Sequence, residues 1–387
     1  MPFPQIYNLA LYCHLACAHL AASAMTTNPL TFHSLMNDSL IAQLQALLDQ
    51  AVADGSELGL QLALYEHGQP VASLVAGFAD AQRRRPIRED TLFPVFSVGK
   101  GVLATLAHRL VQRGTLSYAT RVADVWPEFA AHGKQDVLFW HLLAHRAGLQ
   151  HFPWPETDDQ LADWDTCCRL VADMTPAWQP STRHAYHAIS FAWLVGNTLA
   201  RADGRTLPQL LHDEITAPLH LQDELYFGTD MTMDTRIPDL VPRQGNLGEL
   251  AAKMASPTIR HACIPSFNGC MSARAIARHY AALLDPVDGL DAPLLNPDTL
   301  DNAAHVRRLP DDQPLPGSWA THGLGYICHN ASTDLIGHGG ALGAEGFLVR
   351  SRHLAVGFTR NVQSPDIPRL PLRDAISDLL ELPHRHW

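Results

Sequence analysis

The hydrophobic and polar positions near the start of the chain recur with the period of a helix and then with that of strands. Over residues 37–53, apolar side chains return every three or four positions, which predicts a helix with one buried face. Residues 58–65 and 70–77 are rich in apolar side chains and flank a short polar turn, so we expect the two strands of a hairpin. The arginine-rich stretch 79–89 follows and is expected to be a solvated loop.

The apolar run 93–96 ends at Ser97, where the pattern changes from strand-like to helical. A helix is predicted from Ser97 to about Gln112, because Gly114 then interrupts the pattern. Lys100 follows Ser97 by three residues, and positions i and i+3 share one face of a helix. The Ser97 hydroxyl and the Lys100 amine are therefore expected to meet.

The middle of the chain differs in pattern from both ends. Residues 114–319 combine helical periods with many prolines and tryptophans and few alternating segments, which indicates a mostly helical region. Near the C-terminus, four strands and a last helix are predicted over 324–328, 334–337, 346–350, 353–359 and 370–380. Strands at both ends with helices between them favour an α+β fold. We expect a leader or disordered tail over 1–35, a sheet domain built from 36–113 together with 320–387, and an inserted helical domain over 114–319.

Composition and charge exclude several classes of function. The 387 residues are 47% hydrophobic and 17% charged, which is typical of a folded globular protein. The net charge is −11, and no lysine or arginine precedes Arg83. Nucleic acids and anionic membrane surfaces both require a basic face, so neither is an expected partner. No stable membrane insertion is expected, and the sequence does not indicate an oligomeric state.

The cysteines and the first residues bear on localisation. Seven cysteines occur at irregular spacings in a long chain, which favours reduced thiols in a reducing compartment. Residues 9–24 are apolar and end in small side chains, as a secretory signal does. However, no positive charge precedes them, and His14 and His19 interrupt the run. We expect a cytoplasmic protein, with export by residues 1–24 and a true start at Met25 as the alternatives.

Ser97 and Lys100 form the smallest arrangement that could make an acyl-enzyme. A serine is a weak nucleophile until a neighbouring base takes its proton, and a partly desolvated lysine can act as that base. A four-residue pattern also occurs by chance, so its weight depends on the other motifs of the chain. No G-x-S-x-G surrounds a serine, H-E-x-x-H is absent, and no glycine-rich phosphate loop joins a strand to a helix.

Three further groups of residues are candidates either for chemistry or for packing. His141 and His145 are four apart on a predicted apolar helix, where they could bind zinc or form hydrogen bonds in the core; we prefer the core interpretation. Tyr186 precedes a predicted helix, 189–199, and is either half-buried packing or functional. The glycine-dense stretch 337–343 is either a bulge or turn, or a strand along which a substrate lies beside free N–H groups.

In this order, the stretches around Ser97, Tyr186 and His338 resemble the serine β-lactamase and penicillin-recognising superfamily. The resemblance is closest to the class C-like branch that includes family VIII carboxylesterases, and it covers residues 36–380. Other similar segments are 122–129, 133–134, 141–149, 193–196, 265–269 and 273–278. The resemblance implies a β-lactamase/penicillin-binding transpeptidase-like fold, with an antiparallel sheet flanked by helices and an inserted all-α domain.

The resemblance also implies roles for individual residues. Ser97 takes the position of the nucleophile, Lys100 that of its proton acceptor, and Tyr186 that of the tyrosine that shuttles the proton to the leaving group. The substrate-binding triplet His338-Gly339-Gly340 stands where β-lactamases have Lys-Thr-Gly. The backbone N–H groups of Ser97 and Ala341 would form the oxyanion hole. No metal and no organic cofactor is implied.

Two departures from the family pattern affect the expected substrate. Position 188 is alanine where the tyrosine motif normally has asparagine, so the amide that would hold an acylamino side chain is missing. His338 in place of lysine removes a permanent cation that would attract a carboxylate. We therefore expect a serine hydrolase acting on esters of small or medium acyl groups. The alternatives are a weak β-lactamase or D-amino-acid peptidase and, outside the enzymes, an inactive penicillin-type sensor or scaffold.

Overall fold

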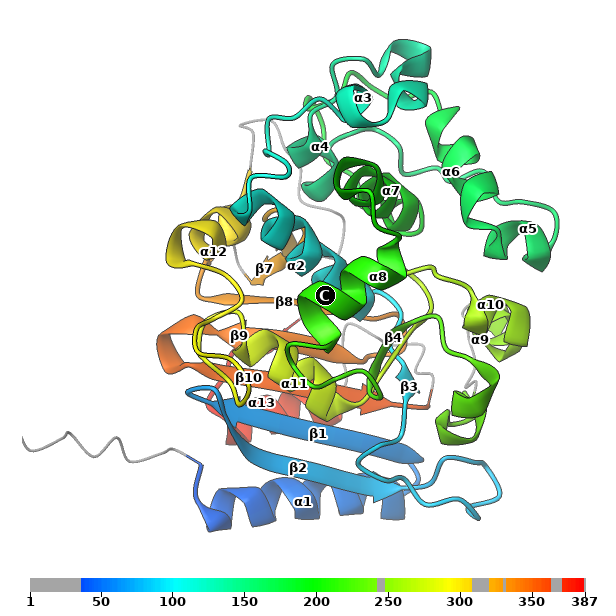
Figure 1. Cartoon of the computed structure of the whole chain (residues 1–387). Helices are drawn as coiled ribbons and strands as arrows, with labels where there is room; N and C mark the ends of the chain where they lie inside the picture. Colours follow the sequence, from blue (N-terminus) through cyan, green and yellow to red (C-terminus); the bar gives the residue numbers. More distant parts are fainter. Residues whose placement is uncertain (1–35, 242–247, 308–319, 330–331, 363–370, 386–387) are drawn as a thin grey trace, which may run out of the picture. The chain divides into compact units, whose positions relative to one another are not determined.

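A seven-stranded sheet, antiparallel at every pairing, organises the fold (Figure 1). The computed structural model describes residues 36–241, 248–307, 320–329, 332–362 and 371–385. In spatial order the strands are β2 (Gln69–Gly77), β1 (Gly59–Glu66), β10 (Leu354–Arg360), β9 (Glu345–Val349), β8 (Leu335–Gly339), β7 (Ile327–His329) and β6 (Ala320–His322). The sheet is thus built from both ends of the chain, as the sequence predicts.

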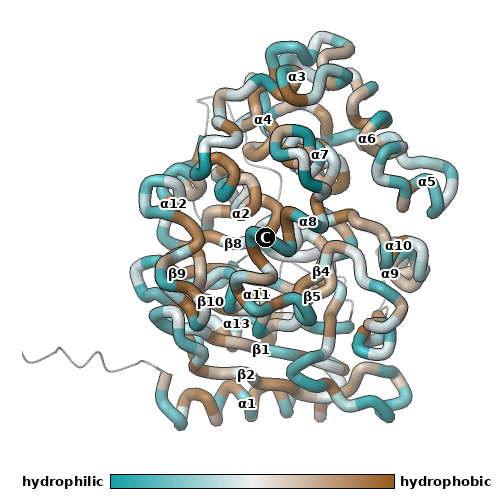
Figure 2. The backbone as a smooth tube through the Cα atoms, in the orientation of Figure 1, coloured by the Kyte–Doolittle hydropathy of each residue, from teal (hydrophilic) through white to brown (hydrophobic). Residues whose placement is uncertain are grey.

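Helices cover both faces of this sheet. The even-numbered leucines of β1 point to one face, where they pack with α1 (Asp38–Ala53) and α13 (Pro371–Leu379). The odd-numbered side chains of β1 point to the other face, which α11 (Ala273–Ala281) covers. The α1 tube alternates between hydrophobic and hydrophilic residues in Figure 2, as expected of a helix that buries one face. This arrangement confirms the expected α+β class.

A mostly helical part lies between β2 and β6 in the sequence. Its central helix, α2 (Val98–Gln112), packs on α7 (Phe191–Asp203) and on β8. The other helices here are α3 (Val122–Val125), η1 (Pro127–Gly133), α4 (Phe139–Leu143), α5 (Asp158–Ala162), α6 (Trp164–Ala172), α8 (Leu207–Leu211), η2 (His212–Thr216), η3 (Met231–Arg236), α9 (Gly248–Ala255), α10 (Pro257–His261) and α12 (Pro297–Ala304). A short turn, η4 (Arg350–Arg352), follows β9.

A second, small sheet lies beside the start of α2; the sequence indicates only its first strand, in the apolar run 93–96. It consists of β3 (Phe93–Pro94), β5 (Gly269–Met271) and β4 (Leu225–Phe227), with β5 in the middle. The other two strands, β4 and β5, have three residues each, too few to produce an alternating pattern, so the sequence gives no signal for them. The small sheet nevertheless matters, because β3 leads directly into Ser97.

The prediction of one continuous strand over 324–328 is wrong. The chain makes a tight turn after β6, in which the Gly323 N–H donates to the Tyr326 carbonyl at 2.9 Å. Gly325 adopts a φ of +91°, which few other residues tolerate, and β7 begins only after this turn. Leu324 and Tyr326 face the core from this turn, whereas Ile327 and Cys328 do so from β7.

Other expectations concern the chain as a whole. Within the described ranges, no helix is both long enough and apolar enough to cross a membrane. The five cysteines of the described residues are free thiols. The predicted leader, 1–35, lies outside the described residues. The division into a sheet domain and a helical domain stays a prediction, and so does the cytoplasmic location.

Candidate active site

Ser97 lies at the junction between β3 and α2, as predicted. The preceding residue, Phe96, is buried and adopts a φ of +49°, a left-handed conformation that is strained for a bulky side chain. An edge-to-face contact with Phe267, at 5.5 Å between ring centroids, helps to hold it there. The Val98 N–H then donates to the Val95 carbonyl at 3.2 Å, which closes the turn into the helix. The local fold therefore presents Ser97 from a sharp, supported bend.

Lys100 is fully buried and touches Ser97. Its Nζ lies 2.9 Å from Ser97 Oγ and 3.0 Å from the carbonyl oxygen of Ser266, and its side chain has no exposed surface. Burial lowers the pKa of Lys100 well below its ordinary value because the charged ammonium loses its hydration. A neutral amine in this position can accept the proton of the serine hydroxyl.

Tyr186 completes the group that the sequence predicts. Its ring centroid lies 5.0 Å from Lys100 Nζ, and its phenol forms a hydrogen bond with the Ser97 side chain. Burial raises the pKa of Tyr186 well above its ordinary value, against a smaller opposing effect of that hydrogen bond. The phenol therefore stays protonated, and it can relay a proton by giving up its own while it takes another. The structure brings Ser97, Lys100 and Tyr186 together.

The glycine-dense stretch lies against the segment that precedes Ser97. β8 ends at Gly339, and a Cβ atom on Gly340 would lie only 2.2 Å from the Val95 carbonyl oxygen. Glycine at 340 is thus required for the strand end to come this close. Among the described residues, neither the Ser97 nor the Ala341 backbone N–H donates a hydrogen bond to another backbone group. These two donors are available for a ligand, as an oxyanion hole requires.

His338 is buried beside Lys100 rather than exposed as a cation. Its Nδ1 donates to the Gly339 carbonyl at 2.7 Å, and only 1% of the residue is exposed. Burial, together with the nearby Lys100, lowers the pKa of His338 to about 3. The imidazole is therefore neutral at physiological pH, so the site lacks the permanent positive charge that a lysine would supply at this position.

Sequence reasoning missed a group of histidines around Tyr186. The His322 ring stacks on the Tyr186 ring at 5.7 Å between centroids, and His145 lies 4.6 Å from His322. Burial lowers the pKa of His322 well below 6.5, and the neighbouring His184 lowers it further. In the described part of the chain, neither ring nitrogen of His322 has a hydrogen-bond partner. Only the high histidine count of the sequence hinted at such a cluster, and a count does not show which rings meet.

The expectation that His141 and His145 share a helix is wrong. α4 ends at Leu143, and His145 follows it with a φ of +57°. There the His145 Nδ1 accepts a hydrogen bond from the His187 N–H at 3.1 Å, which fixes the loop that carries Tyr186. Within the described residues, neither histidine belongs to a group of three metal-ligating side chains. The preferred interpretation, histidines that form hydrogen bonds in the core, agrees with these contacts.

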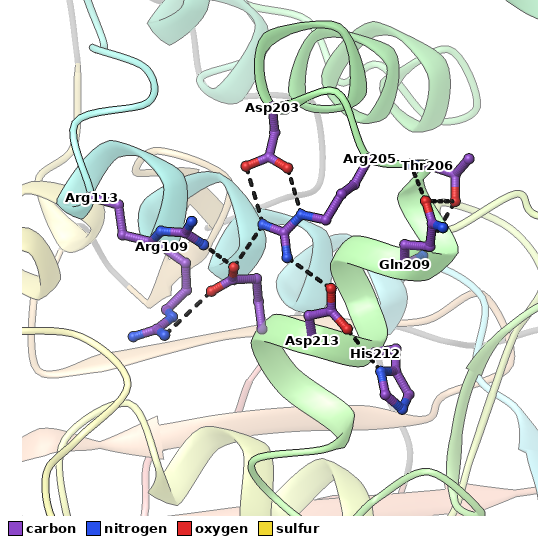
Figure 3. Close-up of polar contacts among 9 residues, drawn as sticks. Arg109, Arg113, Asp203, Arg205, Thr206, Gln209, His212 and Asp213 are labelled. Atoms are coloured by element: carbon purple, nitrogen blue, oxygen red, sulfur yellow. Dashed lines mark hydrogen bonds and ion pairs between the residues drawn. The ribbon is translucent and has the colours of Figure 1, made fainter.

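The far end of α2 is held by a buried carboxylate (Figure 3). Glu214 in η2 is 4% exposed and accepts hydrogen bonds from three arginine side chains. Arg109 lies in α2 and donates at 3.3 Å, and Arg113 caps the C-terminal end of that helix. Arg205 follows α7 and donates at 2.8 Å. This network ties the helix that carries Ser97 and Lys100 to the helices that pack on it.

Comparisons with known proteins bear on the family and the fold of the chain. The model of the Beta-lactamase family matches residues 44–380. The esterase/beta-lactamase LipL of Mycobacterium tuberculosis is 30% identical over 261 residues, which cover 60% of this chain and 60% of LipL. The esterase EstB of Burkholderia gladioli is 31% identical over 219 residues, or 52% of this chain and 55% of EstB. The chain thus spans little more than half the length of these curated relatives.

A solved structure extends the similarity to nearly the whole fold. The crystal structure of a family VIII carboxylesterase superposes with a TM-score of 0.80 at 28% sequence identity. The superposition covers 88% of this chain and 96% of the carboxylesterase. The fold that the sequence analysis expects is therefore confirmed.

Proposed function

Because the chain belongs to the beta-lactamase family, we propose that it is a serine hydrolase that cleaves esters of small or medium acyl groups through an acyl-enzyme on Ser97. The observation that carries the proposal is the 2.9 Å contact between Ser97 Oγ and the buried Lys100 Nζ. A lysine without exposed surface, whose pKa is lowered well below its ordinary value, is suited to act as the base for its neighbour.

Acylation would begin when Lys100 accepts the hydroxyl proton and Ser97 Oγ attacks the ester carbonyl. The oxygen of the tetrahedral intermediate would lie between the Ser97 and Ala341 N–H groups, each of which can contribute about 3 kcal/mol to the stability of the transition state. Tyr186, which is protonated and in contact with both Ser97 and Lys100, would pass the proton to the departing alcohol. Lys100 is then neutral again.

Deacylation would use the same groups in the opposite sense. A water molecule attacks the acyl carbonyl and gives a proton to Lys100 through Tyr186. The intermediate then collapses, Ser97 Oγ leaves and takes the proton back from Lys100, and the carboxylic acid departs. One ester and one water molecule give one acid and one alcohol, and every proton returns to its starting position.

Two features favour esters over the substrates of β-lactamases. His338 is neutral, so the carboxylate of a β-lactam would meet no permanent cation at this position. Ala188 has no amide to hold an acylamino side chain. EstB and the superposed carboxylesterase are named for ester hydrolysis, which supports the same choice. Because LipL is named both an esterase and a β-lactamase, weak β-lactam hydrolysis remains the second candidate.

The test compares Ser97→Ala with the unaltered protein on p-nitrophenyl butyrate and on a chromogenic cephalosporin. We expect measurable turnover of the butyrate, its loss in Ser97→Ala, and its retention in the matched control Ser39→Ala, which alters an exposed serine on α1. Ester turnover that survives in Ser97→Ala would overturn the assignment of the nucleophile. Fast cephalosporin cleavage with negligible ester cleavage would instead favour the β-lactamase. A folded protein inactive on both would favour the sensor or scaffold.

A further inference from the structure

Two histidines and an aspartate meet outside the segments that carry Ser97, Tyr186 and His338. His67 lies in the turn between β1 and β2, Asp285 follows α11, and His353 lies between η4 and β10. The two imidazole rings stack with 4.7 Å between their centroids. Each of the three side chains offers one ligand atom, and these atoms all lie within 4.8 Å of one another. Three segments that are far apart in sequence thus converge on one point.

Backbone contacts hold this arrangement in place. The His67 N–H donates to the His353 carbonyl at 2.9 Å, so the two turns are joined directly. Both histidines adopt a positive φ, +50° and +49°, which the turns impose on them. A Cβ on Gly68 would lie 2.0 Å from the Pro286 carbonyl oxygen, so the hairpin turn is pressed against the segment that carries Asp285. The positions of all three side chains are therefore set by the fold.

The carboxylate of Asp285 has one satisfied and one unsatisfied oxygen. His353 Nδ1 lies 2.7 Å from Oδ1. In the described part of the chain, Oδ2 is buried without a hydrogen-bond partner, and the residue is only 9% exposed. A buried carboxylate oxygen without a partner costs free energy unless a cation or a donor reaches it. This oxygen is a second observation, independent of the two imidazoles, that favours a cation at this position.

We propose that His67, Asp285 and His353 bind one divalent transition-metal ion of the zinc type. Two imidazole nitrogens and one carboxylate oxygen are ligands that zinc accepts, and water would fill a fourth position. Zinc–ligand bonds of about 2.0–2.2 Å place tetrahedral ligands about 3.3 Å apart, so ligand atoms as far as 4.8 Å apart must close by up to about 1.5 Å. His67 is exposed and His353 partly exposed. To face one ion, the two stacked rings would have to turn, and the 2.7 Å contact between His353 Nδ1 and Asp285 would have to open. The ion would replace the proton between His353 Nδ1 and Asp285.

The ion would have a structural role. It would link the β1–β2 turn to the start of β10 and to the segment after α11, all of which the backbone already brings together. None of its ligands contributes to the proposed ester hydrolysis, for which no metal is expected. Ester turnover and metal binding can therefore be measured separately, and the failure of one proposal leaves the other standing.

The experiment uses the full chain without a histidine tag, freed of metal with EDTA and then desalted. Zn²⁺ is titrated in competition with a chromogenic chelator, and Co²⁺ is added in parallel because its visible spectrum reports four-coordinate geometry. The variants are His67→Ala, His353→Ala and Asp285→Asn. The matched control is His384→Ala, which removes an exposed histidine that contacts Asp378 at 2.8 Å.

We expect one Zn²⁺ per chain, an affinity at least about tenfold lower in His67→Ala and His353→Ala, and no change in His384→Ala. The visible spectrum of four-coordinate Co²⁺ should be absent when either histidine is replaced by alanine. The absence of stoichiometric binding, or an unchanged affinity in His67→Ala, would overturn the proposal. Asp285→Asn is the variant most at risk of misfolding, so circular dichroism and the rate of butyrate hydrolysis check each variant. His67 is exposed, so its variant decides the question even if Asp285→Asn does not fold.

Discussion

Replacing Lys100 with methionine should inactivate the protein and at the same time change how its stability depends on pH. Methionine has a similar length and no charge, so it fills the buried space without an ammonium. Loss of a positioned general base typically lowers a rate by about 10²–10⁴-fold, and we expect kcat/KM for p-nitrophenyl butyrate to fall within that range. The same substitution removes the Lys100 amine, whose pKa is lowered by burial. Any dependence of stability on pH that comes from this amine is therefore lost as well.

The sign of the stability effect follows from that depressed pKa. In the unfolded chain Lys100 has an ordinary pKa of about 10.4, whereas in the folded protein the pKa is lower. Between these two values the unfolded state binds one proton more than the folded state. The free energy of unfolding therefore falls by about 1.4 kcal/mol for each unit by which the pH drops through this window. Below the pKa of Lys100 in the folded protein, both states bind the proton, so the free energy of unfolding does not fall further through this group.

Lys100→Met lacks this pH dependence. At high pH the variant should be less stable by about 1 kcal/mol, because the buried Ser266 carbonyl loses the hydrogen bond from Lys100. As the pH falls, the unaltered protein loses stability and the variant becomes the more stable of the two. The difference in unfolding free energy between the two proteins should stop growing at the pKa that Lys100 has in the folded protein. In the unaltered protein, kcat/KM should fall on the acid side at this same pH.

Urea unfolding, followed by tryptophan fluorescence over a series of pH values, measures this difference. The control is Lys253→Met, since Lys253 is partly exposed and pairs with Asp158 at 2.8 Å. That variant should differ by less than about 1 kcal/mol at every pH and should keep its activity. A free-energy difference for Lys100→Met that does not change with pH, or ester turnover within about tenfold of the unaltered protein, would refute the reasoning.

Three other substitutions test separate parts of the account. Tyr186→Phe removes the phenol proton and should lower kcat/KM by about 10²–10⁴-fold in the same assay, with unchanged circular dichroism; a loss below tenfold would contradict a role in proton transfer. Gly340→Ala places a methyl group against the Val95 carbonyl and should cost about 10²-fold in kcat by displacing the strand end, so normal kinetics would show that the close approach is not needed. Glu214→Gln removes the anion shared by three arginines and should cost about 3–5 kcal/mol in urea unfolding, against less than about 1 kcal/mol for the half-exposed Asp213→Asn; equal costs would mean that the buried network does not anchor α2.

The parts of the site that the sequence predicts are those in which local periodicity decides the geometry. Ser97 and Lys100 meet because Ser97 is the N-cap of α2 and Lys100 lies in the first turn of that helix, which spacing alone can reveal. The assignment of Tyr186 and His338 to the site rests on the resemblance to a family, because no local pattern in the sequence places either residue near Ser97. Helices α1 and α13 and the strands β1, β2, β8, β9 and β10 are predictable for the same reason as the first turn of α2, because their hydrophobic periods are regular. The short strands β6 and β7 are not.

Other features depend on contacts between distant segments and left no signal in the sequence. His322 reaches Tyr186 only because β6 lies next to β7 in the folded sheet. The acceptor for Lys100 in the 265–269 loop is a backbone carbonyl, which any residue could supply. His145 was placed on a helix because an apolar period does not show where α4 ends, and the left-handed conformation that follows it has no side-chain signature.

The central claim is that Ser97 carries the acyl group, and trapping that intermediate tests it most directly. The protein is mixed with p-nitrophenyl butyrate, quenched in acid within the first turnovers, digested and analysed by mass spectrometry, beside Ser97→Ala treated identically. The account predicts a butyryl group on Ser97 in the unaltered protein, a burst of p-nitrophenol that matches the amount of enzyme, and neither signal in the variant. A butyryl group on another residue, or an equal burst from Ser97→Ala, would contradict it.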